Sequence, residues 1–400
     1  MDNKKNGIPK LRFPGFTGAW EQRKVSELLE ERTEKAPENK IYPLMAFIAN
    51  KGVAPKGDRY DRAALVKDAK NKKYKRTKLG DFIYSSNNLE TGSIGLNNYG
   101  NASISPVYSI FKPTGIANSD FIGRRFVRKD FINLMIRWRQ GVVYGQWRIH
   151  EKDFLRIDVS VPSLKEQQKI GNFLSDLDSL ITLHQRKLEH LQEQKKGLLQ
   201  KMFPKNGETV PEVRFPGFTD AWEQRKLGEV AEINPSSEIP DNFEYVDLES
   251  VVGTEMIAYR RENKKTAPSR AQRLAKKGDI FYQTVRPYQK NNYHFNLTRK
   301  DFVFSTGYAQ LRPNINGDFL FVYIQLSNFV NEVLNRSTGT SYPAISPSNL
   351  IRMKVAIPTN NEQEKIGAFF KQLDSLIALH QRKLEHLELM KKGLLQQMFV

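Results

Sequence analysis

Cysteine is absent from the 400 residues of this sequence. Its absence excludes disulfides, thiolate metal sites and a cysteine nucleophile, and it fits a reducing compartment. No apolar run approaches the roughly 20 residues that a membrane-spanning helix needs. The N-terminal stretch MDNKKNGIPK also lacks the apolar core of a signal peptide. We therefore expect a cytoplasmic protein that does not associate with a membrane.

Recognisable catalytic and nucleotide-binding motifs are also missing. Neither a GxxxxGKS/T phosphate loop nor a GxGxxG motif is present. The nearest match to the Asn-Pro-Pro-aromatic motif of amino-methylating enzymes begins at Asn234-Pro235 but lacks the second proline and the aromatic residue. Only six histidines occur, and four of them fall inside a repeated segment, which leaves little for a triad or a histidine metal site. We expect no catalytic residue, metal or cofactor in this chain, although a loosely spaced carboxylate nuclease site stays an alternative.

Positive charge is abundant. Lysine and arginine number 63 against 44 aspartates and glutamates, which gives a formal net charge of +19. Such an excess favours a polyanionic partner, and nucleic acid is the first candidate. The alternative is that many of the lysines only solvate the surface.

A long repeat organises the sequence, because Lys169 to Phe203 returns almost unchanged as Lys365 to Phe399. Apolar residues recur in each copy at alternating spacings of four and three, which predicts two long helices with a heptad seam. The predicted pairing residues are Leu174, Leu177, Ile181, His184, Leu188, Leu191 and Leu198 in the first copy, and Phe370, Leu373, Ile377, His380, Leu384, Leu387 and Leu394 in the second.

Polar residues interrupt both seams at the same places, at His184 with Lys195 and at His380 with Lys391. A polar seam residue can fix the register of a coiled coil. The two lysines could equally extend their ammonium groups to water. Connectivity predicts antiparallel pairing, since the second helix must begin near the place where the first one ends. At 1.5 Å per residue, each helix would be about 50 Å long.

A second repeat precedes each globular region. Arg12 to Lys24 reads RFPGFTGAWEQRK, and Arg214 to Lys226 differs from it at one position. The Pro-Gly pair predicts a turn. Its flanking aromatic residues are better interpreted as packing anchors that seat each region on the helices than as platforms for base stacking. The sequence that precedes this repeat also predicts that the two chain ends lie close together.

The two intervening regions differ in sequence but keep landmarks in the same order. A Gly-Asp pair feeds an apolar strand at Gly80-Asp81 and at Gly278-Asp279, and a final strand ends at Pro162 or Pro358. We infer one fold used twice, built from short strands and a few short helices. Ser163 or Asn361 is expected to cap the long helix that follows.

Loops at equivalent positions in the two regions offer the side chains that read base edges and bind phosphates. The alternative is that they are ordinary polar turns. The candidates are Ser85, Ser86, Asn87, Asn88, Arg124, Arg125, Tyr144, Gln146, Trp147 and Arg148 in the first region, and Thr284, Arg286, Tyr288, Gln289, Lys290, Asn291, Arg336, Ser337, Thr338, Thr340, Ser341 and Tyr342 in the second. The basic stretches 70–78 and 260–277 are interpreted as phosphate-facing or solvated surface.

With these features in place, the chain resembles the specificity subunit of type I restriction-modification systems over essentially its whole length. The duplicated RFPGF and AWEQRK segments and the two junctions PSLKEQQKI and PTNNEQEKI carry the resemblance. The expected fold is α+β, with an internal pseudo-two-fold repeat and two similar target-recognition domains separated by two long antiparallel coiled-coil helices. The expected boundaries are 1–163 for the N-terminal arm and first domain, 164–203 for the central helix, 204–212 for a linker, 213–360 for the second domain and 361–400 for the C-terminal helix.

The resemblance implies a non-catalytic reader of double-stranded DNA. Each domain would read half of an asymmetric bipartite target, and the helices would set the spacer and dock two modification (methyltransferase) subunits. Restriction subunits, which translocate and cleave DNA, would join them. S-adenosylmethionine, ATP and magnesium would belong to those partners. Contacts to the modification subunits would come from Gln185, Arg186, Glu189, Gln381, Arg382 and Glu385. The alternatives are a scaffold that binds DNA without sequence preference and a self-contained DNA-modifying enzyme.

Overall fold

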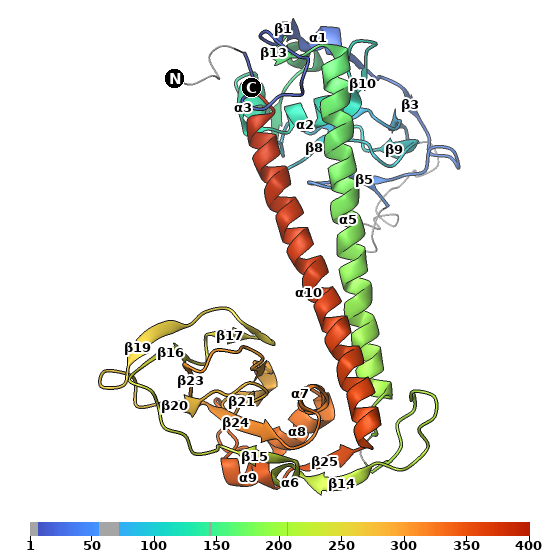
Figure 1. The fold of residues 1–400 in the computed structure, drawn as a ribbon. Helices are drawn as coiled ribbons and strands as arrows, with labels where there is room; N and C mark the ends of the chain where they lie inside the picture. Colours follow the sequence, from blue (N-terminus) through green and yellow to red (C-terminus); the bar gives the residue numbers. More distant parts are fainter. Residues whose placement is uncertain (1–6, 56–71, 144–145, 206) are drawn as a thin grey trace. The chain divides into compact units, whose positions relative to one another are not determined.

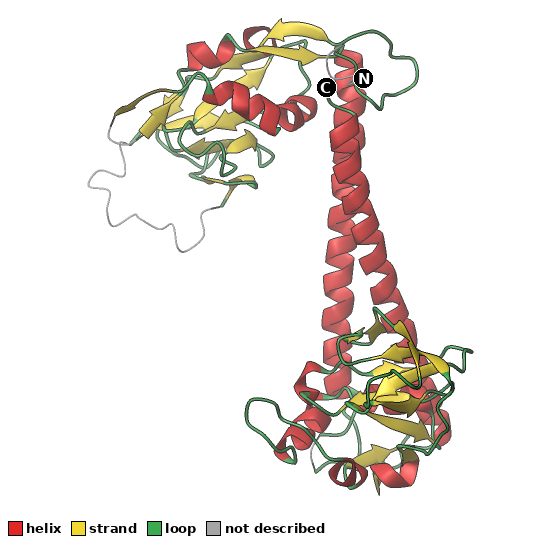
Figure 2. Cartoon of the chain, turned by 90° about the vertical axis from the view of Figure 1, so that its left-hand side faces the viewer, coloured by secondary structure: helices red, strands yellow, loops and turns green. Residues whose placement is uncertain are grey.

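The structure is a computed structural model that describes residues 7–55, 72–143, 146–205 and 207–400. Its contacts divide the chain into two compact units. Unit 1 comprises residues 1–184 and 383–400, and unit 2 comprises residues 185–382. Each unit contains a globular domain of short strands and short helices together with parts of two long helices, α5 (Leu164–Lys201) and α10 (Asn360–Gln397) (Figure 1, Figure 2).

The domain of unit 1 is built on an antiparallel four-stranded sheet and an antiparallel three-stranded sheet. In order across the four-stranded sheet, the strands are β2 (Leu29–Glu31), β10 (Ser109–Pro113), β7 (Phe82–Tyr84) and β8 (Ile94–Leu96). The three-stranded sheet consists of β3 (Lys35–Ala36), β6 (Tyr74–Thr77) and β9 (Ala102–Ile104). The remaining elements are the strand pairs β1 (Glu21–Lys24) with β13 (Asp158–Val161), β4 (Ala46–Ile48) with β5 (Gly52–Ala54), and β11 (Gln140–Val143) with β12 (Gln146–Arg148), and the helices α1 (Val25–Leu28), α2 (Ser119–Phe126), α3 (Lys129–Ile136) and α4 (Glu151–Leu155).

The domain of unit 2 repeats this plan with a larger second sheet. Its antiparallel main sheet has the order β15 (Ala231–Ile233), β24 (Tyr308–Pro313), β21 (Ile280–Gln283) and β22 (Tyr293–His294). Its second sheet has the order β19 (Arg260–Asn263), β16 (Asn242–Val246), β23 (Phe302–Ser305) and β20 (Ala271–Leu274), and β16 runs parallel to β23. The remaining elements are the strand pairs β14 (Glu223–Lys226) with β25 (Lys354–Ile357) and β17 (Val251–Val252) with β18 (Glu255–Met256), the helices α6 (Leu227–Val230), α7 (Gly317–Tyr323), α8 (Ser327–Asn335) and α9 (Pro347–Ile351), and the 3-10 helix η4 (Pro287–Gln289).

Corresponding elements occupy corresponding places in the two domains, which confirms the prediction of one fold used twice. The order β2-β10-β7-β8 in unit 1 matches the order β15-β24-β21-β22 in unit 2. Each final strand pairs with the EQRK segment in the same register, with Glu21 opposite Val161 and Glu223 opposite Ile357. The predicted Gly-Asp turns lead directly into β7 and β21.

The long helices each contain 38 residues, and each begins two residues after a proline, Pro162 for α5 and Pro358 for α10. In α5 the backbone N–H groups of Glu166 and Gln167 donate to the carbonyl of Ser163, which occupies the cap position. In α10 the equivalent N–H groups donate to the carbonyl of Thr359. The prediction that Asn361 caps this helix is wrong, because Asn361 lies within the first turn and Thr359 precedes it.

The two helices pack antiparallel, as predicted from connectivity. In unit 1 the first turns of α5 share a core cluster with the last residues of α10, and in unit 2 the last turns of α5 share one with the first turns of α10. Nine of the predicted seam residues are buried: Leu174, Leu177, Ile181, Leu188, Leu191, Phe370, Leu373, Leu384 and Leu387. Partly buried are Leu198, Ile377 and Leu394, which pack against the two clusters, and the two histidines His184 and His380.

The seam lysines form an ion pair with the other helix in each unit. In unit 2 the Nζ atom of Lys195 lies 2.5 Å from Oδ1 of Asp374. In unit 1 the Nζ atom of Lys391 lies 2.6 Å from Oδ1 of Asp178. Because each lysine reaches a carboxylate on the facing helix, the structure favours a role in register over extension into water alone.

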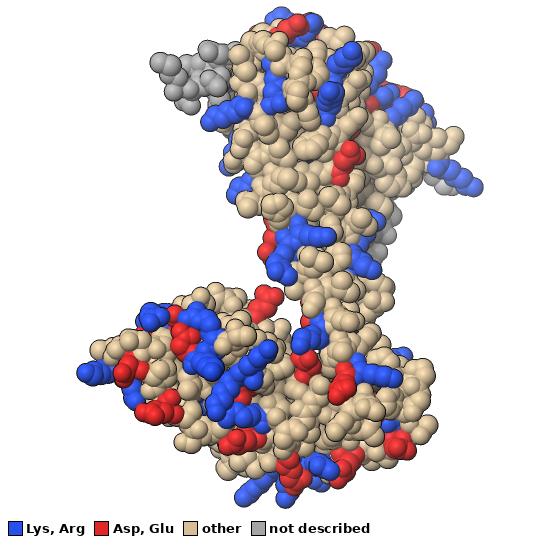
Figure 3. Space-filling model, in the orientation of Figure 1, with Lys and Arg blue, Asp and Glu red and all other residues tan. Residues whose placement is uncertain are grey.

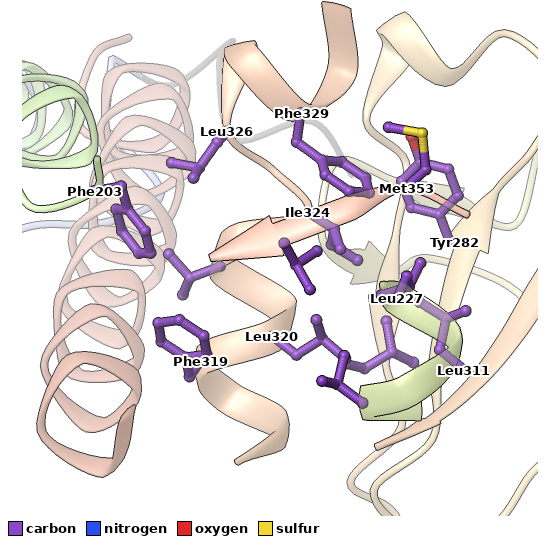
Figure 4. Packing of buried hydrophobic residues seen from close by; sticks show 14 of the residues in the cluster. Phe203, Leu227, Tyr282, Leu311, Phe319, Leu320, Ile324, Leu326, Phe329 and Met353 are labelled. Atoms are coloured by element: carbon purple, nitrogen blue, oxygen red, sulfur yellow. The ribbon is translucent and has the colours of Figure 1, made fainter. Parts of the chain in front are cut away.

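The aromatic residues of the second repeat anchor each domain to the helices, as interpreted from the sequence. The Trp222 ring lies 5.8 Å from the rings of both Phe319 and Phe203, the latter just after α5. Figure 4 shows Phe203 beside Phe319 of α7, in the cluster that continues to Phe329 and Met353. Trp20 has the same kind of neighbours in unit 1, Phe121 of α2 and Phe399 after α10.

Candidate nucleic-acid interface

Two of the predicted contact loops of unit 2 lie against each other. The backbone N–H of Arg286 donates to the carbonyl of Pro343 at 2.7 Å, and the N–H of Ile345 donates to the carbonyl of Thr284 at 3.1 Å. Val285 also forms an isolated bridge with Ala344. The segments 284–292 and 336–345, about 50 residues apart in the sequence, therefore form one polar surface, which we call the unit 2 loop pair.

The first segment of this loop pair has an unusual backbone. Arg286 and Lys290, at the two ends of η4, both have positive φ angles, of 55° and 56°. Left-handed backbone at a residue other than glycine costs about 1 kcal/mol or more and persists only where surrounding contacts fix it. Here Asn292 supplies one such contact, because its Oδ1 accepts from the backbone N–H of Gln283 at 2.8 Å.

Side chains of this segment are held in different ways. Arg286 places its guanidinium carbon 4.3 Å from the centroid of the Tyr342 ring, which is 62% exposed. Lys290 donates from Nζ to the carbonyl of Gln325 at 2.7 Å, and burial, with a smaller contribution from nearby Lys195, lowers its pKa below the usual value for lysine. Asn291 accepts from the backbone N–H of Gly253 through Oδ1.

The other predicted residues of the loop pair divide into exposed and engaged groups. Tyr288, Gln289, Thr340 and Ser341 are exposed, and Thr338 is exposed while its backbone bridges Ala344. Thr284 is buried and donates from Oγ1 to the carbonyl of Gly307. Arg336 pairs with Glu332, and the hydroxyl of Ser337 donates to the carbonyl of Val333.

Unit 1 brings the equivalent segments together through different contacts. The backbone N–H of Ile149, just after β12, donates to Oγ of Ser86 at 3.0 Å. Arg139 links the same two segments, since it donates to the carbonyl of Ser86 and to Glu90, and its guanidinium lies 6.0 Å from the Trp147 ring. We call residues 85–90 and 146–149 the unit 1 loop pair.

Among the predicted residues of the unit 1 loop pair, Asn87, Asn88, Trp147 and Arg148 are exposed and Ser85 is buried. Gln146 begins β12, and Tyr144 lies outside the described residues. Arg139 was not among the sequence candidates, although it stands in a basic and aromatic run, Arg137-Trp138-Arg139, just before this hairpin. That run is the signal that could have identified it.

Arg124 and Arg125 do not lie in the unit 1 loop pair. Arg124 on α2 reaches α5, where its Nη2 is 2.8 Å from Oδ2 of Asp178. Arg125 is 5% exposed and pairs with Asp130 at 2.7 Å. A guanidinium that is engaged in this way has little free surface for a base, so the geometry favours a structural role for both residues.

The basic stretch 260–277 is only partly free for phosphates. Arg260 pairs with Asp247 and Glu262, and Arg261 pairs with Glu244. Figure 3 shows blue and red side chains interleaved on the face of unit 2 that carries β19 and β23. In the stretch 70–78, residues 70 and 71 lie outside the described part of the chain.

The described residues offer neither a metal site nor a membrane-spanning helix. Residues 7–55, 72–143, 146–205 and 207–400 hold no group of three or more His, Cys, Asp or Glu side chains that could bind a metal ion. Within the same ranges, every helix is too short or too polar to cross a membrane.

Comparison with known proteins places these features in a family. The model of the type I restriction modification DNA specificity domain matches residues 18–193 and 219–389. The type I restriction enzyme MjaVIII specificity subunit of Methanocaldococcus jannaschii is 25% identical over 272 residues, which are 62% of this chain and 62% of that protein. The type I restriction enzyme HindI specificity subunit of Haemophilus influenzae is 25% identical over 189 residues, which are 45% of this chain and 41% of that protein. The chain thus spans less than two thirds of the length of either relative.

A solved structure agrees in fold over nearly the whole chain. The crystal structure of a type I restriction-modification system S subunit from M. genitalium has a TM-score of 0.60 at 14% identity and covers 98% of this chain and 99% of that chain. The family model matches the two domains separately and together accounts for most of the sequence. The chain therefore belongs to the type I restriction-modification specificity subunit family, with two specificity domains that are each followed by a long helix.

Proposed function

We propose that each domain of this chain reads one half of a bipartite, asymmetric target in double-stranded DNA. The observation that carries this proposal is the loop pair, which recurs at the same place on the duplicated frame but with different residues in the two units. A fixed frame with divergent loops is what a protein needs to present two different sets of base contacts. The net charge of +19 supports contact with phosphates.

The family is one of specificity subunits, in agreement with the prediction that the chain is not itself an enzyme. We propose that it works in the cytoplasm with two modification (methyltransferase) subunits and with restriction subunits. S-adenosylmethionine, ATP and magnesium would be used by those subunits. The expected division into 1–163, 164–203, 204–212, 213–360 and 361–400 is retained as part of this proposal.

The helices would set the distance between the two half-sites. Each has 38 residues, or about 57 Å at the usual rise. This length is compatible with half-sites one turn of DNA apart, about 34–36 Å between centres. A spacer of several base pairs follows from this comparison.

A repeated apolar surface on the helices supports docking of two equivalent partner subunits. Leu180 and Leu183 on α5 are 40% and 62% exposed, and Leu376 and Leu379, at the equivalent positions of α10, are 46% and 40% exposed. Exposed leucines at matching places in two copies indicate two similar binding surfaces. They lie close in sequence to the predicted contact residues around Gln185 and Gln381.

Leu183→Asp and Leu379→Asp test this docking surface. Each variant should reduce copurification of a cognate modification subunit, and the double variant should abolish it. Leu389→Asp is the matched control, because Leu389 is 69% exposed on α10 but its counterpart in α5 is Glu193. Equal copurification of the double variant and the control would contradict docking at this surface.

Sequencing of adenine methylation tests the function as a whole. A methylation-free host would express a cognate modification subunit with or without this chain. A split motif that appears only with the chain is the expected result. Methylation without sequence preference would favour the scaffold alternative, and methylation or cleavage by the purified chain alone would favour the enzyme alternative.

Heptad insertions test the spacing role. One heptad added to α5 alone should disrupt the antiparallel register and abolish methylation. One heptad added to both helices preserves the pairing and should lengthen the spacer of the methylated motif. An unchanged spacer in the second variant would contradict the spacing role.

A further inference from the structure

Each loop pair has an arginine near an aromatic ring, Arg139 near Trp147 in unit 1 and Arg286 near Tyr342 in unit 2, and the two arginines differ in one chemical respect. Arg139 in unit 1 directs its N–H groups to Glu90 and to the carbonyl of Ser86. Arg286 in unit 2 has the Tyr342 ring over its guanidinium, and no hydrogen bond or ion pair of that guanidinium is found within the described residues. Its N–H donors are therefore free for a ligand.

The position of this guanidinium is fixed by the backbone on both sides. The Arg286 N–H donates to the carbonyl of Pro343, the residue next to Tyr342, and its own carbonyl accepts from the N–H of Gln289 at 3.0 Å. These bonds hold Arg286 in the left-handed region with φ of 55°. Strained backbone that is held by neighbouring contacts is typical of residues positioned for binding.

The stack selects how the arginine can bind. The Tyr342 ring occupies one side of the group, with its centroid 4.3 Å from the guanidinium carbon, and the N–H donors point outward in the guanidinium plane. Two parallel N–H donors at an arginine edge match the O6 and N7 acceptors of guanine in the major groove. A phosphate would also accept from this edge, but it requires no such fixed orientation and could be bound by any of the exposed lysines.

We propose that Arg286 reads a guanine in the half-site bound by unit 2, and that Tyr342 positions its guanidinium. This assignment rests on the proposed function and adds a specificity-determining residue to it. Arg286 makes the base contact, whereas Tyr342 acts through the arginine.

Methylation sequencing of Arg286→Gln and Arg286→Lys, each expressed with a cognate modification subunit, tests the assignment. The preference for guanine at one position of the unit 2 half-site should be lost or should change to another base. The other half-site and the spacer should stay unchanged. Methylation of the original site should fall about five- to 150-fold, the range for loss of one bidentate base contact. Arg286→Lys retains the positive charge and loses the fork, so it separates charge from geometry.

Further variants separate positioning from folding. Tyr342→Phe keeps the ring and should preserve the motif. Tyr342→Leu should weaken the preference for guanine at the same position as the arginine variants do. Lys300→Ala is the control, because Lys300 is exposed in unit 2 outside the loop pair and the basic stretch. Persistence of the remaining bases of the unit 2 half-site in each motif would show that unit 2 of the variant is folded.

Two results would overturn the assignment of Arg286. One is a uniform fall in methylation at an unchanged motif, which would indicate a phosphate contact. The other is an unchanged motif at an unchanged level. Failure of the wild-type chain to direct any split motif would instead overturn the proposed function itself, so the two failures are distinguishable.

Discussion

Arg12 holds Glu166 with two parallel bonds, Nε to Oε1 and Nη2 to Oε2, both of 2.7 Å. Glu166 is 1% exposed in the first turn of α5, so the pair fastens the N-terminal arm to the start of that helix. Arg214 holds Glu362 in the same way at the start of α10. Each unit thus joins its aromatic anchor segment to a long helix through a bidentate ion pair in which the glutamate is buried and the arginine is partly buried.

Arg12→Ala should destabilise unit 1 by about 3 kcal/mol, because it leaves the buried carboxylate of Glu166 without its partner. Urea unfolding would measure the loss in the free energy of unfolding. Hydrogen exchange of the backbone amides of α1 and α2 would show that the loss lies in unit 1. The double variant Arg12→Ala with Glu166→Gln should be less destabilised than the sum of the single variants.

A further control is whether each variant destabilises only the unit that contains the mutated arginine. Arg214→Ala should destabilise unit 2 and leave exchange in α1 and α2 unchanged. If Arg12→Ala affected both units equally, or if the double variant were fully additive, the ion pair would not be the source of the stabilisation.

Exchange of charge between Lys195 and Asp374 should test the register of the helices. Lys195→Asp places two carboxylates together, and Asp374→Lys places two ammonium groups together. Because both groups are partly exposed, each single change should cost about 1 kcal/mol. The double variant restores the attraction and should return the thermal unfolding midpoint close to that of the wild type. A double variant that is less stable than both single variants would contradict a role in register.

Trp222 should contribute mainly through its apolar surface. The side chain is 2% exposed among the rings of Phe203 and Phe319, and its buried Nε1–H has no hydrogen-bond partner among the described residues. Trp222→Ala should therefore cost about 3–5 kcal/mol by leaving a cavity. Trp222→Phe also removes the unpaired donor but removes less side-chain volume than Trp222→Ala. It should therefore lower the free energy of unfolding clearly less, as measured by urea unfolding of both variants. Equal costs would contradict a contribution that scales with the apolar surface buried by the side chain.

The features that sequence predicted well are those that depend on repetition and periodicity. The heptad pattern of Leu174, Leu177 and their equivalents predicted two long helices, and connectivity predicted their antiparallel direction. The duplicated aromatic residues predicted the packing anchor at Trp20 and Trp222. Repeats of this kind give the same information twice, which makes a chance match improbable.

Partners of polar side chains were not predictable from the same patterns. Asp81 and Asp279 follow equivalent glycines and are both buried, but Arg32 after β2 binds the first and Arg312 on β24 binds the second. An ion pair depends on which distant segments the fold brings together, and different residues can provide the same charge. Arg124 is an example. Its partner Asp178 lies on α5, far away in the sequence, so the sequence suggested a DNA contact for this arginine and gave no sign of the ion pair.

Asp318 should make the stability of unit 2 depend on pH. Its carboxylate lies 3.2 Å from Nδ1 of His294 and 2.9 Å from Nζ of Lys371. The hydrogen bond from His294, and then the bond from Lys371, hold the pKa of Asp318 below its ordinary value near 3.8. Because the folded state favours the ionised carboxylate, the stabilisation is fully present above about pH 5 and is lost as the pH falls through the lowered pKa.

Asp318→Asn should therefore destabilise unit 2 by roughly 1 kcal/mol at pH 7, a modest value because the group is partly exposed to solvent. Urea unfolding of the wild type and the variant at pH 7, 5 and 3.5 measures the difference between them. We expect similar differences at pH 7 and 5 and a smaller one at pH 3.5, where this position is protonated in most of the unfolded wild-type chains. A difference that stayed constant down to pH 3.5 would mean that the shape of the side chain, and not its charge, is responsible. Lys371→Ala is the matched second variant, since removal of one cationic partner should raise the pKa of Asp318 and move the loss of stability to higher pH.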